Sequence, residues 1–195
     1  MFLSSPSLPE RSVVTGTGNS SASSAPGREA AFQNVVGSGA VGPDGYVYIT
    51  TGDNRVGSVP QNLSVLGAKV LRITREGAAA PGNNPPNSGN TGANPLIYAW
   101  GFRNPQGIAF RPGSGAPYLS EHGPNFQDEV TPLRAGGNGS WDPACSNGSG
   151  GYCGYDNITQ MTDLVKFPNA MRPAWTTGST VGSSRGMGGS VFVSG

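Results

Sequence analysis

Two neighbouring segments of this sequence concentrate the residue types that can do chemistry. The first, Trp100–Phe110, contains Arg103 and two amide side chains, and the second, Ser120–Glu129, contains the only histidine of the chain and three carboxylates. A structural loop seldom needs so many hydrogen-bonding groups between strand-like segments. A guanidinium together with amides and carboxylates is typical of loops that hold a flat, anionic or metal-bound ligand.

Strands must position these segments, because β-branched and aromatic residues recur between turn residues along the chain. Gly42–Gly45 combines Gly, Pro and Asp, which favours a turn, and Tyr46–Thr50 follows it as a strand. In the strand expected at Ala68–Thr74, Val70 and Leu71 should face opposite sides of a sheet. Further strands are expected at Leu96–Trp100, Gly107–Phe110, Pro117–Ser120 and Ser190–Val193, with a helical turn at Asp163–Phe167.

A weak internal repeat indicates the architecture. Ser38–Thr50 resembles Gln106–Ser120, since each contains a strand, a Pro/Gly turn, a strand and a polar loop, and a third copy begins at Gly188. Such repeats are typical of propeller blades, whose loops gather around a central channel. A β-sandwich also explains the short strands but not the similar polar loops. Because a single last strand cannot pair its edge, we expect an all-β, loop-rich fragment of a longer β-propeller.

The composition excludes several classes of protein. Charged residues make up 12% of the 195 residues and the formal net charge is +1, which argues against a nucleic-acid binder. No apolar run is long enough to span a membrane, and the first residues lack the pattern of a signal peptide. Residues 1–30, rich in Ser, Gly and Pro, are expected to form a flexible or loop segment, which leaves 31–195 as one incomplete propeller domain.

The two cysteines, Cys145 and Cys153, lie close together in a segment rich in Gly, Ser and Asn. We favour a short disulfide bond between them, which would fit an oxidising compartment, periplasmic or extracellular. Two free thiols are the alternative, and no partner His or Cys suggests a metal site at these positions.

Taken together, the motifs resemble those of the soluble PQQ-dependent sugar dehydrogenases, the glucose/sorbosone dehydrogenase family. The more specific part is Arg-Asn-Pro-Gln-Gly at 103–107 coupled to His-Gly-Pro at 122–124 and Asp-Glu at 128–129. The resemblance covers most of residues 35–195 and implies a six-bladed propeller, of which this chain would form about half. It also implies the oxidation of an aldose at its anomeric carbon, with hydride transfer to PQQ, a calcium ion that holds the cofactor, and a separate electron acceptor.

The same resemblance implies which side chains would hold PQQ. Arg103 and Asn104 would contact its quinone oxygens and carboxylates, with Gln106 beside them, and Thr180 would line the cofactor pocket. A guanidinium pairs with a carboxylate through two parallel hydrogen bonds and stabilises negative charge on a reduced quinone.

The resemblance also implies metal ligands. The backbone carbonyls of Gly123 and Pro124 would ligate the calcium next to PQQ, because carbonyl oxygens suit a hard cation. Glu129 would ligate a second, structural calcium.

The general base is where this sequence departs from the family. The family carries a histidine just upstream of the Gly-Pro-Asp-Gly turn, and that position is Asn34 here, with Gln33 beside it. An amide cannot accept a sugar hydroxyl proton near neutral pH. His122 is the remaining candidate, although it is equally explained as a residue that orients its own loop. A non-catalytic β-propeller binding module that has lost its general base is therefore the alternative function.

Structural explanations also exist for the other polar and aromatic residues. Arg103 could stack on a neighbouring aromatic ring, Asp53 could cap a turn, and the Asp128–Glu129 pair could be solvated. The three tryptophans, Trp100, Trp141 and Trp175, are expected to pack within blades.

Overall fold

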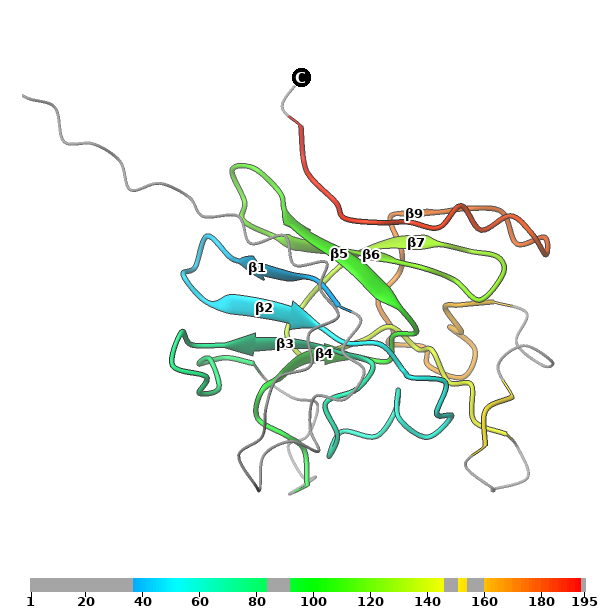
Figure 1. Ribbon diagram of the computed structural model, residues 1–195, viewed down its shortest axis with the longest axis horizontal. Helices are drawn as coiled ribbons and strands as arrows, with labels where there is room; N and C mark the ends of the chain where they lie inside the picture. The colour runs from blue at the N-terminus through cyan, green and yellow to red at the C-terminus, as the bar shows by residue number, and fades with distance from the viewer. Residues whose placement is uncertain (1–36, 84–91, 146–150, 154–159, 194–195) are drawn as a thin grey trace, which may run out of the picture.

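The computed structural model describes residues 37–83, 92–145, 151–153 and 160–193, and these residues form strands, turns and loops without a helix (Figure 1). The prediction of an all-β fold is therefore confirmed for the described part of the chain. The segment 1–30 and the position Asn34 lie outside it. Among the described residues, no helix is long and apolar enough to cross a membrane.

The first sheet has the strand order β1-β2-β3-β4-β8, in which β8 runs parallel to β4 and the other neighbours are antiparallel. The β1–β2 connection is the expected turn, closed by a 2.8 Å hydrogen bond from Gly42 N to Tyr46 O. Gly45 has φ of +83°, a conformation that glycine adopts without steric cost. The strands are β1 (Gly39–Val41), β2 (Val47–Thr50), β3 (Lys69–Ile73), β4 (Ile97–Trp100) and β8 (Gly137–Asn138).

The second sheet has the order β5-β6-β7-β9, with all neighbours antiparallel. Its β5–β6 hairpin repeats the arrangement of β1–β2, so the internal repeat seen in the sequence corresponds to two similar hairpins (Figure 1). The strands are β5 (Pro105–Phe110), β6 (Pro117–Glu121), β7 (Glu129–Pro132) and β9 (Trp175–Thr176).

A shared apolar core joins the two sheets. Val70 of the first sheet is fully buried in one cluster with Leu119 of the second. Leu71 belongs to a separate cluster with Ile97 and Trp100, on the other face of the first sheet. The prediction that Val70 and Leu71 face opposite sides is confirmed, and both sides are buried.

Several expectations about local structure have clear outcomes. The turn at 163–167 is a single one, closed by a 3.0 Å hydrogen bond from Phe167 N to Asp163 O. Cys145 and Cys153 form a disulfide bond, which decides between the two alternatives. Trp100 and Trp141 are buried as expected, but the expectation for Trp175 is wrong, because it is 53% exposed on the edge strand β9.

The strand expected at Ser190–Val193 is also wrong. This segment has no ladder partner among the described residues; instead, Ser120 Oγ donates a 2.9 Å hydrogen bond to Gly188 O. Phe192 packs edge-on against Tyr118, with ring centroids 5.1 Å apart. Side-chain contacts with β6, rather than strand pairing, therefore hold this end of the chain.

Candidate functional site

The two chemically rich loops meet at one end of the second sheet. The 101–104 segment connects β4 to β5, and the 122–128 segment connects β6 to β7. Because β5 and β6 are antiparallel, the start of β5 lies beside the end of β6, and Pro105 pairs with Glu121. The hairpin therefore brings together residues that are about twenty positions apart in the sequence.

Arg103 bridges the two loops directly. Its Nη1 donates hydrogen bonds to the carbonyl oxygens of His122, at 2.8 Å, and Gly123, at 2.9 Å. His122 N in turn donates to Asn104 O at 3.0 Å, and Gln106 Nε2 donates to Asn104 Oδ1 at 2.6 Å. The guanidinium, both predicted amides and the imidazole loop thus form one hydrogen-bonded cluster, which we call the Arg103 cluster.

Glu121 supports the backbone of this cluster and was not predicted as a site residue from the sequence. Its side chain is buried, and its Oε1 accepts a hydrogen bond from Arg103 N. Burial raises the pKa of Glu121 to about 8, and repulsion from Glu129, its partner in the β6–β7 register, adds to this. By accepting a hydrogen bond from Arg103 N, Glu121 fixes the backbone from which the Arg103 side chain extends.

Asp128 joins the 122–124 loop to the 184–186 segment. Its side chain is fully buried, so the interpretation of Asp128–Glu129 as a solvated acidic pair is wrong. Burial acts to raise the pKa of Asp128, but hydrogen bonds from Ser184 and from backbone N–H groups outweigh it and lower the pKa. Oδ1 accepts from Gly123 N at 2.9 Å and Ser184 Oγ at 2.7 Å, and Oδ2 from Arg185 N at 2.6 Å and Gly186 N at 3.0 Å.

The ring of His122 has a defined orientation. Its Nδ1 lies 2.8 Å from Gly123 O and 3.2 Å from both Ser184 Oγ and Asp128 Oδ1. Three oxygen atoms around Nδ1 favour the tautomer with the proton on Nδ1, and in that tautomer Nε2 is the acceptor. The half-buried ring therefore combines the two roles expected from the sequence. It is held in place by its own loop, and it presents Nε2 as an acceptor.

The carbonyl of Gly123 does not fit the expected calcium. It accepts hydrogen bonds from Arg103 Nη1 and His122 Nδ1, which use both of its lone pairs and place a cation against it. Calcium takes six to eight oxygen ligands, and the Gly123 carbonyl would have to exchange these two donors to become one of them. Glycine itself is required here, because a Cβ at position 123 would lie 1.9 Å from Phe126 O.

Two other predicted residues lie apart from the Arg103 cluster. Glu129 faces the opposite side of β7 from Asp128, where its Oε2 accepts a 2.8 Å hydrogen bond from Thr162 Oγ1. Burial raises its pKa to about 7. Thr180 is exposed on the turn at 178–183, where its carbonyl accepts a 2.9 Å hydrogen bond from Ser183 N.

Asp53 has a structural place beside the site. Its Oδ1 accepts from Arg55 N at 2.9 Å, which forms the expected turn, and its Oδ2 accepts from Trp141 Nε1 at 2.8 Å. Its own N–H donates to Arg103 O at 2.8 Å. Asp53 therefore attaches the first sheet's loop to the backbone of the Arg103 cluster.

Comparison with known proteins decides the family. The family model described as Glucose / Sorbosone dehydrogenase matches residues 25–194. The chain belongs to the glucose/sorbosone dehydrogenase family. In this family member, the Arg-Asn-Pro-Gln-Gly and His-Gly-Pro motifs therefore build the Arg103 cluster.

Individual relatives agree with this assignment. The chain is 38% identical over 97 residues to the aldose sugar dehydrogenase YliI of Escherichia coli (strain K12), covering 50% of this chain and 26% of that protein. It is 35% identical over 120 residues to quinoprotein glucose dehydrogenase B of Acinetobacter calcoaceticus, covering 52% and 24%. A crystal structure described as an oxidoreductase (glucose dehydrogenase) from Thermus thermophilus is 43% identical, with a TM-score of 0.51 over 55% of this chain and 33% of that one.

These likenesses confirm a partial β-propeller. The chain spans only about a quarter to a third of the length of these relatives.

The sequence predicted four residues of the cluster, Arg103, Asn104, Gln106 and His122, but not Glu121 and Ser184. Glu121 had a signal, since it precedes His122 at the end of a predicted strand, whereas nothing local to Ser184 indicated its bond to Asp128.

Proposed function

We propose that this family member is part of a PQQ-dependent dehydrogenase that oxidises an aldose, and that the Arg103 cluster binds the cofactor. The observation that carries the proposal is the pair of hydrogen bonds from Arg103 Nη1 to His122 O and Gly123 O. They hold a partly exposed guanidinium next to an imidazole and two amides, and this set of groups fits an acidic, planar quinone.

PQQ, when bound, accepts the hydride from the sugar. The residues of this chain would bind and orient it, because Arg103 supplies a fixed positive charge for its carboxylates and for the charge of the reduced quinone. The amides of Asn104 and Gln106 would add hydrogen bonds. Glu121 and Asp128 keep the two loops in place from beneath, through the backbone N–H groups of Arg103 and Gly123.

His122 is the candidate for the proton transfer. Its Nδ1 is surrounded by Gly123 O, Ser184 Oγ and Asp128 Oδ1, which fixes the ring and favours Nε2 as the basic atom. A basic nitrogen next to the cofactor residues is what removal of the sugar hydroxyl proton requires. Calcium at Gly123 has no part in this proposal, because the Gly123 carbonyl already accepts hydrogen bonds from Arg103 and His122.

A non-catalytic binding module is the second candidate, and Asn34 at the family's base position is the observation that favours it. The two candidates differ in one measurement. The protein is mixed with PQQ, aldoses and an artificial electron acceptor, and reduction of the acceptor dye is followed. Cofactor binding without turnover favours the module, and turnover gained by Asn34→His would show that the base was the missing part.

Binding of PQQ itself tests the role of the cluster. We expect Arg103→Ala to weaken PQQ binding, followed by quenching of tryptophan fluorescence, by about tenfold or more, since a hydrogen-bonded charge pair is lost. Arg103→Lys should recover only part of the affinity, because lysine lacks the two-pronged geometry. Arg111→Ala, a change of the same charge on the β5–β6 turn, is the control. Equal binding by all four proteins would refute the proposal.

We also propose a periplasmic or extracellular location for the protein, with an electron acceptor supplied by another molecule. The Cys145–Cys153 disulfide supports this, because such bonds persist in oxidising compartments.

A further inference from the structure

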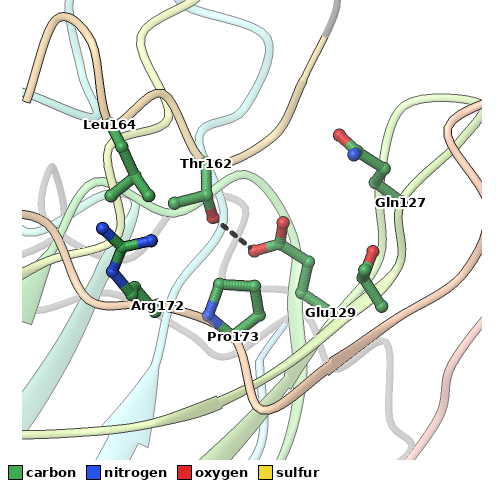
Figure 2. Close-up of a pocket in the computed structure, with 7 residues that line it drawn as sticks. Gln127, Glu129, Thr162, Leu164, Arg172 and Pro173 are labelled. Atoms are coloured by element: carbon green, nitrogen blue, oxygen red, sulfur yellow. Dashed lines mark hydrogen bonds between the residues drawn. The ribbon is translucent and has the colours of Figure 1, made fainter.

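A second site lies on the side of β7 to which Glu129 points, opposite to Asp128. It is a cavity of about 310 Å³ between the start of β7, the turn that begins at Thr162 and the segment leading into β9. That volume is at the lower end of the range for small-molecule sites. Figure 2 shows six of the lining residues with labels: Gln127, Glu129, Thr162, Leu164, Arg172 and Pro173.

The cavity contains a buried carboxylate with acceptor capacity left over. Glu129 is 4% exposed, and one of its oxygens accepts the hydrogen bond from Thr162 Oγ1 (Figure 2). Among the described residues this is the one hydrogen bond recorded for its side chain. A carboxylate can accept about four hydrogen bonds. The second oxygen is directed away from Thr162 in Figure 2 and is not among the buried polar atoms that lack a partner, so it is open to the cavity, where a ligand hydroxyl can donate to it in place of water.

The rest of the lining supplies complementary groups. Arg172 is exposed at the cavity and brings N–H donors, and Gln127 brings an amide whose Oε1 is already used by Met161 N at 2.8 Å. Leu164 and Pro173 add apolar surface between these polar groups. A ligand that matches must therefore offer hydroxyl donors to Glu129, oxygen acceptors to Arg172 and Gln127, and C–H surface to the apolar side chains.

We propose that this cavity binds a neutral polyhydroxylated molecule of about the size of a sugar alcohol. Glu129, with a pKa of about 7, is partly ionised at neutral pH, and its negative charge disfavours simple anions as the pH rises above 7. Apolar ligands would leave its oxygens without hydrogen-bond partners. A divalent cation needs six or more oxygen ligands, whereas this cavity has Glu129 as its one carboxylate and is also lined by the positive charge of Arg172. The lining residues do not include Arg103 or His122, but Glu129 is the register partner of Glu121, which accepts a hydrogen bond from Arg103 N, so the cavity borders the support of the Arg103 cluster.

D-sorbitol is a suitable probe, because it has no anomeric carbon and so cannot be a substrate of the proposed oxidation. It is titrated into the ¹⁵N-labelled chain while the backbone amide shifts of Gln127, Thr162 and Thr176 are recorded. We expect saturable shifts at these amides. Arg172→Ala and Glu129→Gln should each weaken binding by about tenfold, the effect of one lost charged hydrogen bond. Arg172 is exposed, so its variant should keep the fold even if the Glu129 variant does not.

Arg111→Ala again provides the matched control, and its affinity for sorbitol should equal that of the unmodified chain. Three results would overturn the proposal. One is the absence of saturable shifts, and another is affinity that Arg172→Ala leaves unchanged. The third is a calcium titration that moves the same amides when sorbitol does not, which would make this a cation site.

Discussion

The replacement Asp128→Asn is the sharpest test of how the site is held together. Asp128 is fully buried and accepts hydrogen bonds from three backbone N–H groups and from the Ser184 hydroxyl. These donors come from two segments that are more than fifty residues apart in the sequence, at Gly123 and at 184–186. The carboxylate therefore attaches the 184–186 segment to the 122–124 loop, together with the contact between Ser184 Oγ and His122 Nδ1.

The expected cost follows from the geometry. Asparagine has the same shape, but one of its two oxygen positions becomes an NH₂ group. Oδ1 lies near Gly123 N, Ser184 Oγ and His122 Nδ1, and Oδ2 near Arg185 N and Gly186 N. Whichever way the amide turns, at least two hydrogen bonds to a charged acceptor are lost, and at least one backbone N–H group is opposed by another donor. At about 1.5 kcal/mol or more for each bond, the free energy of unfolding should fall by at least about 3 kcal/mol. That is a large share of the roughly 5–15 kcal/mol typical of a domain.

Two assays report this change separately. Urea denaturation followed by tryptophan fluorescence gives the loss of stability. Trypsin cleavage between Arg185 and Gly186, identified by product mass, reports the release of the segment, because both flanking N–H groups are bound to Asp128 Oδ2. Asp142→Asn, which breaks an exposed pair with Lys166, is the control and should cost less than about 1 kcal/mol. A variant that unfolds at the same urea concentration as the unmodified chain, without faster cleavage at 185–186, would refute this reasoning.

Three further predictions concern the rest of the chain. Glu121 has a folded pKa of about 8 against an ordinary 4.5, so the folded state binds its proton more tightly. The stability that this provides is complete below about pH 4.5 and is lost as the pH rises through 8; in urea titrations across this range, Glu121→Gln should flatten the loss. Replacing both Cys145 and Cys153 by alanine opens a loop of sequence separation 8 and should lower the free energy of unfolding by about 2–3 kcal/mol, whereas unchanged stability would exclude a structural role. Gly123→Ala places a Cβ 1.9 Å from a backbone carbonyl oxygen and should cost about 1–3 kcal/mol in thermal unfolding, while Gly188→Ala, which has open space, should cost far less.

Much of the fold was predictable because it rests on local patterns. Turn residues and alternating apolar positions located most of the first sheet and the β5–β6 hairpin. The strands β7, β8 and β9 were not predicted. β8 and β9 have two residues each and exist only through pairing with β4 and β7, and β7 (Glu129–Pro132) directly follows the polar loop at 122–128. The opposite error occurred at Ser190–Val193, where strand-forming residues lie against β6 through side-chain contacts.

For the candidate site, the sequence by itself determined which groups are present. The Arg-Asn-Pro-Gln-Gly and His-Gly-Pro motifs, and the turn between two predicted strands, were enough to place Arg103 near His122, because an antiparallel hairpin brings its two ends together.

Only the tertiary structure decided what those groups are bonded to. The Gly123 carbonyl was expected to face a metal, but it accepts hydrogen bonds from Arg103 and His122. Asp128 and Glu129, adjacent in the sequence, point to opposite sides of one strand, so that one organises the Arg103 cluster and the other lines a separate cavity. The physical reason is that a hydrogen bond depends on the position of both partners, and partners as distant as Ser184 are brought to Asp128 only by the packing of the whole chain.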